Sequence, residues 1–248
     1  MNTRINMMNF NVDNLSMQET LLKIEEIIKD RKPTQHVVVN ASKAVMIQKD
    51  EKLRRIINEC PLINADGQSI VWASKFLGKP LVERVAGIDL MEEIIQLSAE
   101  KEYSIYFFGA KEEVVKEVVK LYKHKYPSLK VAGYRNGYFK EEDNEEIVND
   151  IKNSNADILF VAFSSPKKEY WLKNFCTEME VPFQMGVGGS FDVVAGITKR
   201  APRWMQKLGM EWFYRFMQEP KRMWKRYLLG NLKFVSYVVR ERWRKPKL

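Results

Sequence analysis

Cysteine and histidine are scarce in this chain, which contains two of each among its 248 residues. Cys60 and Cys176 stand far apart without a CxxC spacing, so the sequence predicts neither a disulfide framework nor a zinc site. Both thiols are expected to be buried, in a reducing compartment. His36 and His124 stand alone and form no cluster of metal ligands in the sequence. We therefore expect no metal and no cofactor.

Long apolar runs are also lacking. No segment approaches the roughly 18 apolar residues of a transmembrane helix, and residues 1–6 lack the apolar core of a signal peptide. We expect a protein that is soluble or peripheral to a membrane, and cytoplasmic. Two nucleotide signatures are missing as well. The sequence GVGGS at 186–190 lacks the Gly-Lys-Ser ending of a phosphate loop, and Gly109 lacks the other glycines of a dinucleotide fingerprint.

Positive charge is concentrated at one end of a chain whose net charge is +9. Residues 197–248 hold 15 Lys and Arg but 3 acidic residues, whereas residues 1–196 hold 26 basic and 29 acidic residues. This asymmetry predicts a catalytic domain at 1–196 and an appendage at 197–248. Aromatic residues interleave with the cations of the appendage, which is typical of helices at an anionic membrane surface. The alternative is a solvated basic face around aromatics that pack on the core.

Apolar runs alternate with amphipathic segments along residues 16–196. We expect strands at 36–39, 61–63, 104–108, 131–132, 157–162 and 183–185, and helices at 16–28, 42–57, 70–73, 90–99, 111–126, 141–154 and from 164 onward. Ser16 and Glu19 form a capping box for the first helix, and Ser42 is expected to cap the second. The alternation predicts a Rossmann-like α/β fold, a mostly parallel sheet with helices on both faces.

Polar or glycine residues follow most of the expected strands, at Asn40, Asp66, Gly109, Gly137, Ser164, Gly188 and Gly189. In parallel sheets, ligands bind beyond the carboxyl ends of the strands, and glycine lets backbone N–H groups approach a phosphate. Asp66 in an Asp-Gly turn and Arg84, about one helix later, would open on the same crevice. An Asp in such a turn also commonly caps the next helix, so the residue types leave both roles open.

Three blocks of sequence resemble one family. They comprise NADG at 64–67, VWAS at 71–74, GKP at 78–80 and ERVAGID at 83–89; GVGGSFD at 186–192 with Gly196 and KRAP at 199–202; and Glu211, Trp212, Arg215, Glu219, Pro220 and Arg222. In order and spacing these are similar to the WecG/TagA/CpsF family, over nearly the whole chain. Its members are bacterial glycosyltransferases that move a sugar from a UDP donor to a polyprenyl-diphosphate-linked sugar.

The resemblance implies an inverting transfer in which Asp66 is the general base for the acceptor hydroxyl, with Asp89 and Asp192 as competitors. No two aspartates stand two positions apart, so the Asp-X-Asp motif of many metal-dependent sugar transferases is absent. We expect fixed positive charge to stabilise the departing diphosphate instead. The predicted substrate-binding residues are Asn40, Arg84, Gly109, Gly137, Lys168, Glu169, Gly188, Gly189, Asp192, Arg215 and Arg222.

The appendage is implied to close over the crevice and to bring the enzyme to the inner face of the cell membrane. Arg215 and Arg222, seven residues apart, are expected on one helical face, where they would contact a diphosphate. The family also suggests self-association into a homo-oligomer.

The leading assignment is transfer of N-acetylmannosamine from UDP to undecaprenyl-diphosphate-linked N-acetylglucosamine, as in teichoic acid synthesis. Other family members use UDP-linked glucose, glucuronic acid or N-acetylmannosaminuronic acid, and no residue excludes these donors. Ser164 and Lys168 replace the family's usual small residue and Gln, and Val38 replaces a frequent Thr. These departures affect the choice of donor sugar more than the class of reaction.

Two other classes of function compete with this one. A basic chain with an Arg/aromatic tail also suits single-stranded nucleic acid. Residues 1–196 are net acidic, however, and contain no recognised nucleic-acid module, so we expect no nucleic-acid partner. The third interpretation is an inactive membrane scaffold, and the intact stretch from Asp66 to Arg84 argues against it.

Overall fold

A computed structural model describes residues 4–224 and 229–243, the side chains of Lys207, Arg222 and Met223 excepted. Its centre is a six-stranded sheet in the order β4-β3-β8-β7-β5-β6. The strands are β3 (Thr34–Val39), β4 (Leu62–Ala65), β5 (Ser104–Gly109), β6 (Lys130–Arg135), β7 (Ile158–Ala162) and β8 (Phe183–Gly186). Every neighbouring pair is parallel. The prediction of an α/β fold is confirmed.

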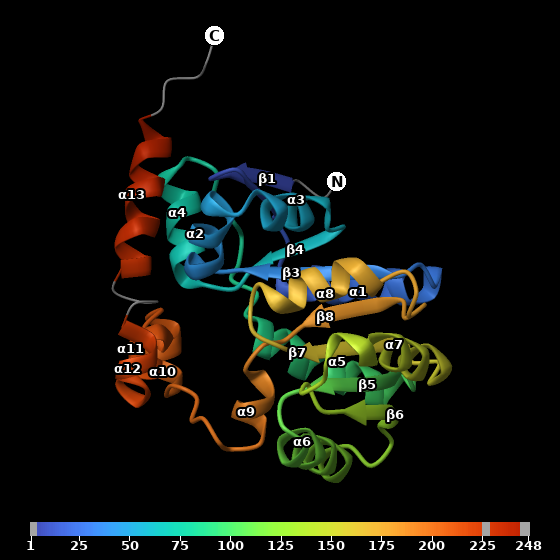
Figure 1. The fold of residues 1–248 in the computed structure, drawn as a ribbon. Coiled ribbons are helices and arrows are strands. Elements are labelled where there is room, and N and C mark those ends of the chain that lie inside the picture. The colour runs from blue at the N-terminus through green and yellow to red at the C-terminus, as the bar shows by residue number, and fades with distance from the viewer. Residues whose placement is uncertain (1–3, 225–228, 244–248) are drawn as a thin grey trace.

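Helices cover both faces of the sheet (Figure 1). On one face lie α1 (Met17–Asp30), α5 (Gly87–Lys101), α6 (Glu112–Lys125) and the short α9 (Ser190–Val194), whose apolar residues share a cluster with Val38, Phe107 and Phe160. On the other lie α2 (Ala41–Lys49), α3 (Glu51–Glu59), α7 (Asn144–Asn153), which follows the 3-10 turn η1 (Glu141–Asp143), and α8 (Lys167–Phe175). Successive residues of a strand point to opposite faces, so the fully buried strands β3, β4, β7 and β8 supply both cores.

The helix starts show where side-chain capping set the boundaries. The capping box at α1 is confirmed, because Glu19 N donates to Ser16 Oγ at 3.2 Å and Ser16 N donates to Glu19 Oε2 at 2.8 Å. The expected cap at Ser42 is wrong. Asn40 Oδ1 accepts the N–H of Lys43 at 3.1 Å instead, so α2 begins earlier. The segment is also two helices, because Asp50 leaves the helical conformation and its Oδ1 accepts from Leu53 N at 2.9 Å, which starts α3.

A hairpin that was not predicted precedes α1. It consists of β1 (Arg4–Met7) and β2 (Phe10–Asp13), paired antiparallel. Arg4 donates to both carboxylate oxygens of Asp13, at 2.8 and 2.9 Å, and Asp13 Oδ2 accepts from Ile63 N at 2.7 Å. Asp13 therefore ties the hairpin to β4, at the edge of the sheet.

The C-terminal segment is helical, as predicted. It contains α10 (Arg203–Lys207), α11 (Glu211–Gln218), α12 (Pro220–Trp224) and α13 (Gly230–Arg242). Figure 1 shows these helices together on one side of the molecule, with α13 next to α2. Phe234 and Val238 of α13 are buried in the same core cluster as Val37 of β3. The domain boundary after residue 196 stays a prediction.

Two expectations about this segment can be compared with the helices. Arg215 and Arg222 do not share one helical face, because α11 ends at Gln218, Glu219 leaves the helical conformation, and α12 starts at Pro220. None of the helices within the described residues is long and apolar enough to cross a membrane. Both cysteines are free thiols, Cys60 buried and Cys176 half-buried.

Candidate active site

A cavity of about 1300 Å³ opens beyond the carboxyl ends of β3, β4, β7 and β8. The first turns of α2, α5 and α9 line it from the α/β domain, and α11 and α13 line it from the C-terminal segment. The predicted site residues on its wall are Asn40, Asp66, Arg84, Lys168, Gly188, Gly189, Asp192 and Arg215. A second hollow of about 1390 Å³, beside α7 and α8, has none of the described predicted residues on its wall. The first cavity is therefore the candidate active site.

Asp66 lies in the turn after β4, with its carboxyl group at the start of α5. Its Oδ1 accepts the N–H of Gly87 at 2.9 Å. The interpretation of Asp66 as the cap of the next helix is wrong, since α4 (Gln68–Phe76) follows Gly67, which has no side chain to cap it. Burial raises the pKa of Asp66, and the Glu211 carboxylate raises it further. The Gly87 N–H and the nearby Arg84 and Lys43 lower it, but the net change is upward. A carboxylate with a raised pKa is a better proton acceptor.

A ring of four alternating charges stands beside Asp66. Arg200 donates from Nη1 and Nη2 to the two carboxylate oxygens of Asp89, at 2.6 and 2.8 Å. Its Nε donates to Glu211 at 3.3 Å. Arg84 closes the ring, 3.4 Å from Glu211 and 3.8 Å from Asp89. The ring joins the start of α5 to the C-terminal helices. Of its members, Arg84 was predicted to bind substrate and Asp89 was a competing candidate for the base, whereas Arg200 and Glu211 were given no role at the site.

Two lysines share one buried carboxylate at the floor of the cavity. Lys43 Nζ lies 2.7 Å and Lys168 Nζ 3.2 Å from Glu169 Oε1, which also accepts from Ser165 Oγ at 3.0 Å. Glu169 is 1% exposed and Lys43 4%. Burial by itself would raise the pKa of Glu169, but the two ammonium groups outweigh it and hold that pKa at about 2. The cluster therefore carries one more positive than negative charge.

This cluster belongs to the cavity through its lysines, and Lys43 Nζ also donates to the backbone oxygen of Val38 at 2.6 Å. Lys43 and Lys168 are on the cavity wall, whereas Glu169 is not among the described residues that line it. Gly186 makes room for Lys168, because a Cβ there would lie 2.5 Å from Lys168 Cδ. Lys43 was missed. The available signal was a lysine in the first turn of a helix that directly follows a buried strand.

The predicted glycines divide into two groups. Gly188, at φ +58°, and Gly189 line the cavity, and a Cβ on Gly189 would lie 3.4 Å from Arg215 Nη2. Gly109 and Gly137 are not among the described lining residues. A Cβ on Gly109 would lie 2.8 Å from the backbone of Ala162, and one on Gly137 would lie 2.8 Å from the Phe163 ring. These two glycines allow close packing behind the cavity, next to its lining residues Ala110 and Tyr138.

The remaining predicted residues come from the C-terminal part of the chain and from α9. Asp192, on α9, and Arg215, on α11, both lie near Gly189. The prediction for Arg222 falls on a side chain outside the described residues. Across residues 4–224 and 229–243, no group of three or more His, Cys, Asp or Glu side chains is arranged to hold a metal ion.

The fold and the site define an α/β protein with a cation-lined cavity at the carboxyl ends of its parallel strands, the place where proteins of this class bind their ligands. The chain belongs to the WecG/TagA/CpsF family of glycosyl transferases, whose family model matches residues 5–248. This confirms the resemblance found in the sequence, and it favours a glycosyltransferase over a nucleic-acid-binding protein or an inactive scaffold.

Curated relatives in this family share one name, N-acetylglucosaminyldiphosphoundecaprenol N-acetyl-beta-D-mannosaminyltransferase. The protein from Bacillus subtilis (strain 168) is 36% identical over 203 residues, which cover 82% of this chain and 78% of the relative. The protein from Bacillus spizizenii (strain ATCC 23059 / NRRL B-14472 / W23) is 32% identical over 204 residues, 82% and 78% of the two chains. The protein from Staphylococcus aureus (strain MW2) is 31% identical over 238 residues, 95% and 91% of the two chains.

Proposed function

We propose that this protein transfers N-acetylmannosamine from UDP to N-acetylglucosaminyl-diphosphoundecaprenol, with inversion and without a metal ion, in teichoic acid synthesis at the inner face of the cell membrane. The observation that carries this proposal is the position of Asp66, a carboxylate of raised pKa in a cation-lined cavity. The relatives whose printed name states this transfer align with most of the chain.

The reaction needs a base, and Asp66 is placed to be that base. The acceptor hydroxyl oxygen attacks the anomeric carbon of the donor sugar, and the bond from that carbon to the UDP oxygen breaks. The hydroxyl proton passes to Asp66, and the bonding electrons leave with UDP. The Gly87 N–H bonded to Oδ1 keeps the carboxylate oriented while its other oxygen receives the proton.

The departing diphosphate requires positive charge, and side chains on the cavity wall can supply it. Lys43, Lys168 and Arg215 line the cavity, and the lysine cluster has a surplus of positive charge. Such preorganised cations stabilise a leaving anion without reorganising during the reaction. This is the basis for proposing that UDP leaves without a divalent ion.

The C-terminal helices are proposed to hold the enzyme on the membrane that carries its acceptor. Trp204, Trp224, Leu232 and Trp243 are exposed on these helices. Exposed aromatic and aliphatic side chains among Lys and Arg suit the headgroup region of an anionic bilayer. A peripheral enzyme held in this way would meet a lipid-linked sugar without any spanning segment.

An assay of UDP release tests the proposed function. Purified full-length protein is incubated with an acceptor analogue that carries N-acetylglucosamine on a lipid diphosphate, and with UDP-N-acetylmannosamine, UDP-glucose, UDP-glucuronate or UDP-N-acetylmannosaminuronate in turn, each with and without EDTA. We expect the fastest release with UDP-N-acetylmannosamine, dependent on acceptor and unaffected by EDTA. Faster release with another donor would reassign the donor, and loss of activity in EDTA would overturn metal independence.

A further inference from the structure

Part of the cavity wall is apolar. Trp72 and Phe76 of α4 and Val235 and Val239 of α13 line the same cavity as Asp66. The four apolar side chains are 53%, 49%, 56% and 36% exposed, in that order. We call these four residues the α4–α13 strip. Large apolar side chains that line one cavity and stay open to solvent mark a surface for an apolar ligand.

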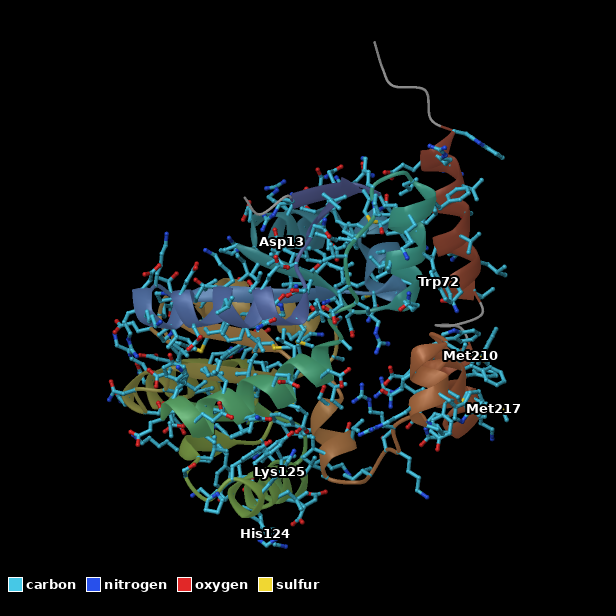
Figure 2. All side chains as sticks on the ribbon, turned by 180° about the vertical axis from the view of Figure 1, so that it is seen from behind. Asp13, Trp72, His124, Lys125, Met210 and Met217 are labelled. Carbon is cyan, nitrogen blue, oxygen red and sulfur yellow. The ribbon has the colours of Figure 1, made fainter. Side chains whose placement is uncertain are left out.

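The α4–α13 strip lies next to buried residues that pack α13 against the rest of the protein. Phe234 and Val238 of α13 also line the cavity, and both are buried in a core cluster that includes Ala73 of α4 and Ile47 of α2. Trp72 lies on the side of the molecule that also carries Met210 of the C-terminal segment (Figure 2). A Cβ on Gly209 would lie 3.1 Å from the Trp72 ring, so the turn before α11 contacts this tryptophan. The two helices that carry the strip are therefore fixed by packing in the absence of a ligand.

The apolar strip and the cationic wall belong to one continuous cavity. Lys43, Arg84 and Arg215 are on that wall with the strip residues. A ligand that fits both parts must combine an anionic group with an extended apolar group. We propose that the strip binds the polyisoprenoid chain of the lipid-linked acceptor, with the diphosphate of that acceptor toward the cations. This inference rests on the proposed function.

The orientation of α13 gives the chain a path out of the cavity. Val235 and Val239 line the cavity, whereas Leu232 of the same helix and Trp243, which follows it, are exposed and are not among the described lining residues. An isoprenoid chain that follows α13 would pass from the cavity to the surface proposed to meet the bilayer. Burial of its methylene groups along the strip would supply affinity that the head group lacks.

A comparison of acceptor tails tests this inference. Two analogues share the N-acetylglucosaminyl-diphosphate head, one with an undecaprenyl tail and one with a short alkyl tail, both in detergent. We expect Phe76→Gln and Val235→Gln each to raise the ratio of the KM for the long-tailed acceptor to the KM for the short-tailed acceptor by about tenfold, which corresponds to ~1.4 kcal/mol. Leu22→Gln, the matched change at an exposed position of α1 outside the described cavity wall, should leave the ratio unchanged.

The outcomes separate the inference from the function on which it rests. If the KM ratio is unchanged in both cavity variants while the wild type transfers normally, the proposed role of the α4–α13 strip is wrong and the proposed function stands. A change of sedimentation coefficient in these variants without a change in the ratio would make the strip a contact between copies of the chain, which also overturns it. Failure of the wild type to use either acceptor overturns the proposed function and the strip with it.

Discussion

Arg200 holds Asp89 through two parallel hydrogen bonds, Nη1 to Oδ1 at 2.6 Å and Nη2 to Oδ2 at 2.8 Å. The two residues are 111 positions apart in the chain. Asp89 lies in the first turn of α5, and Arg200 stands just before the buried Ala201 and Met205, which begin the C-terminal segment. A bidentate contact of this kind fixes the orientation of the guanidinium relative to the carboxylate as well as the distance between them. This contact therefore sets how the C-terminal helices meet the cavity.

Replacing Arg200 should impair catalysis more than stability. Arg200→Gln removes this bidentate contact and frees Asp89 and Glu211, so α11 and its Arg215 shift relative to Asp66. We expect kcat/KM to fall about a hundredfold, since misplacement by about 1 Å costs that much. Steady-state UDP release measures this, with the exposed Arg203→Gln as the charge-matched control. Equal activity of the two variants would contradict a positioning role for Arg200.

Asp66→Asn should keep the fold and lose the base. The Asn side chain can still accept the Gly87 N–H, but it cannot take the acceptor proton. We expect turnover to fall between about 10²- and 10⁴-fold, the usual contribution of a general base. The assay is single-turnover sugar transfer, with UDP binding and circular dichroism as checks of the fold. Asp30→Asn, at the exposed end of α1, serves as control. Near wild-type turnover in Asp66→Asn would remove Asp66 from the mechanism.

The pH dependence of activity and stability should reveal the raised pKa of Asp66, which burial causes first of all. The rate falls as pH drops through this pKa, so the acidic limb of kcat/KM should lie above the usual range for aspartate. The ionised form of Asp66 that favours catalysis has the opposite effect on stability. The folded state binds this proton more tightly than the unfolded state, so the charged carboxylate destabilises the fold at neutral pH. Asp66→Asn should therefore unfold at a slightly higher temperature than the wild type at pH 7; a lower one would contradict this.

Glu169→Gln should destabilise the protein strongly. The change leaves the buried ammonium groups of Lys43 and Lys168 without their shared carboxylate. We expect a loss of about 3–5 kcal/mol in the free energy of unfolding, the range for breaking a buried pair from one side. Urea denaturation at pH 7 measures it, with the exposed Glu178→Gln as control. A loss as small as that of the control would contradict this account of the cluster.

The same carboxylate should contribute to acid unfolding. The pKa of Glu169 is about 2 in the folded protein and about 4.3 for an unperturbed glutamate. The ionised carboxylate therefore stabilises the fold fully when the pH is above the pKa of the unfolded state. This stabilisation is lost as the pH falls through the pKa of the folded state.

Membrane binding should depend on exposed aromatics of the C-terminal helices. The double change of Trp204 and Trp243 to Gln removes apolar surface without disturbing the core, since both residues are exposed. We expect partitioning onto anionic vesicles to weaken at least about tenfold. Flotation or sedimentation of vesicles measures this, and Leu22→Gln, at an exposed position of α1, is the control. Deleting residues 203–248 is a poorer test, because it would remove Phe234 and Val238 from the core.

The sequence predicted the sheet well because most of its strands contain a short, largely apolar run. Ile158–Ala162 and Ser104–Gly109 show this. The boundary errors have local causes. Asn40 and Ser42 are both good capping residues, and only the extended backbone at Asn40 decides between them. The hairpin was missed because Arg4 and Asp13, which hold it, are ordinary surface residues until they are brought together.

The candidate site was predicted in part. Asp66, Arg84 and Gly188 follow strands or lie one helix beyond, so the topology of a parallel sheet places them at one edge. The roles of Lys43 and Arg200 could not be derived in this way, although Lys43 also follows a strand. Their roles depend on contacts with Glu169 and Asp89, more than 100 residues away in the chain. The role of Gly109 in binding stays a prediction, since this glycine at the end of β5 is also explained by the closeness of the Ala162 backbone.

The four-membered ring of Arg84, Asp89, Arg200 and Glu211 has no net charge, because two guanidinium groups face two carboxylates. An incoming diphosphate that binds these arginines competes with the carboxylates of Asp89 and Glu211, so one ion pair is exchanged for another and few counterions are released. The contribution of the ring to affinity should therefore be nearly insensitive to ionic strength. At the lysine cluster the charge is unbalanced, and there added salt should compete with the ligand.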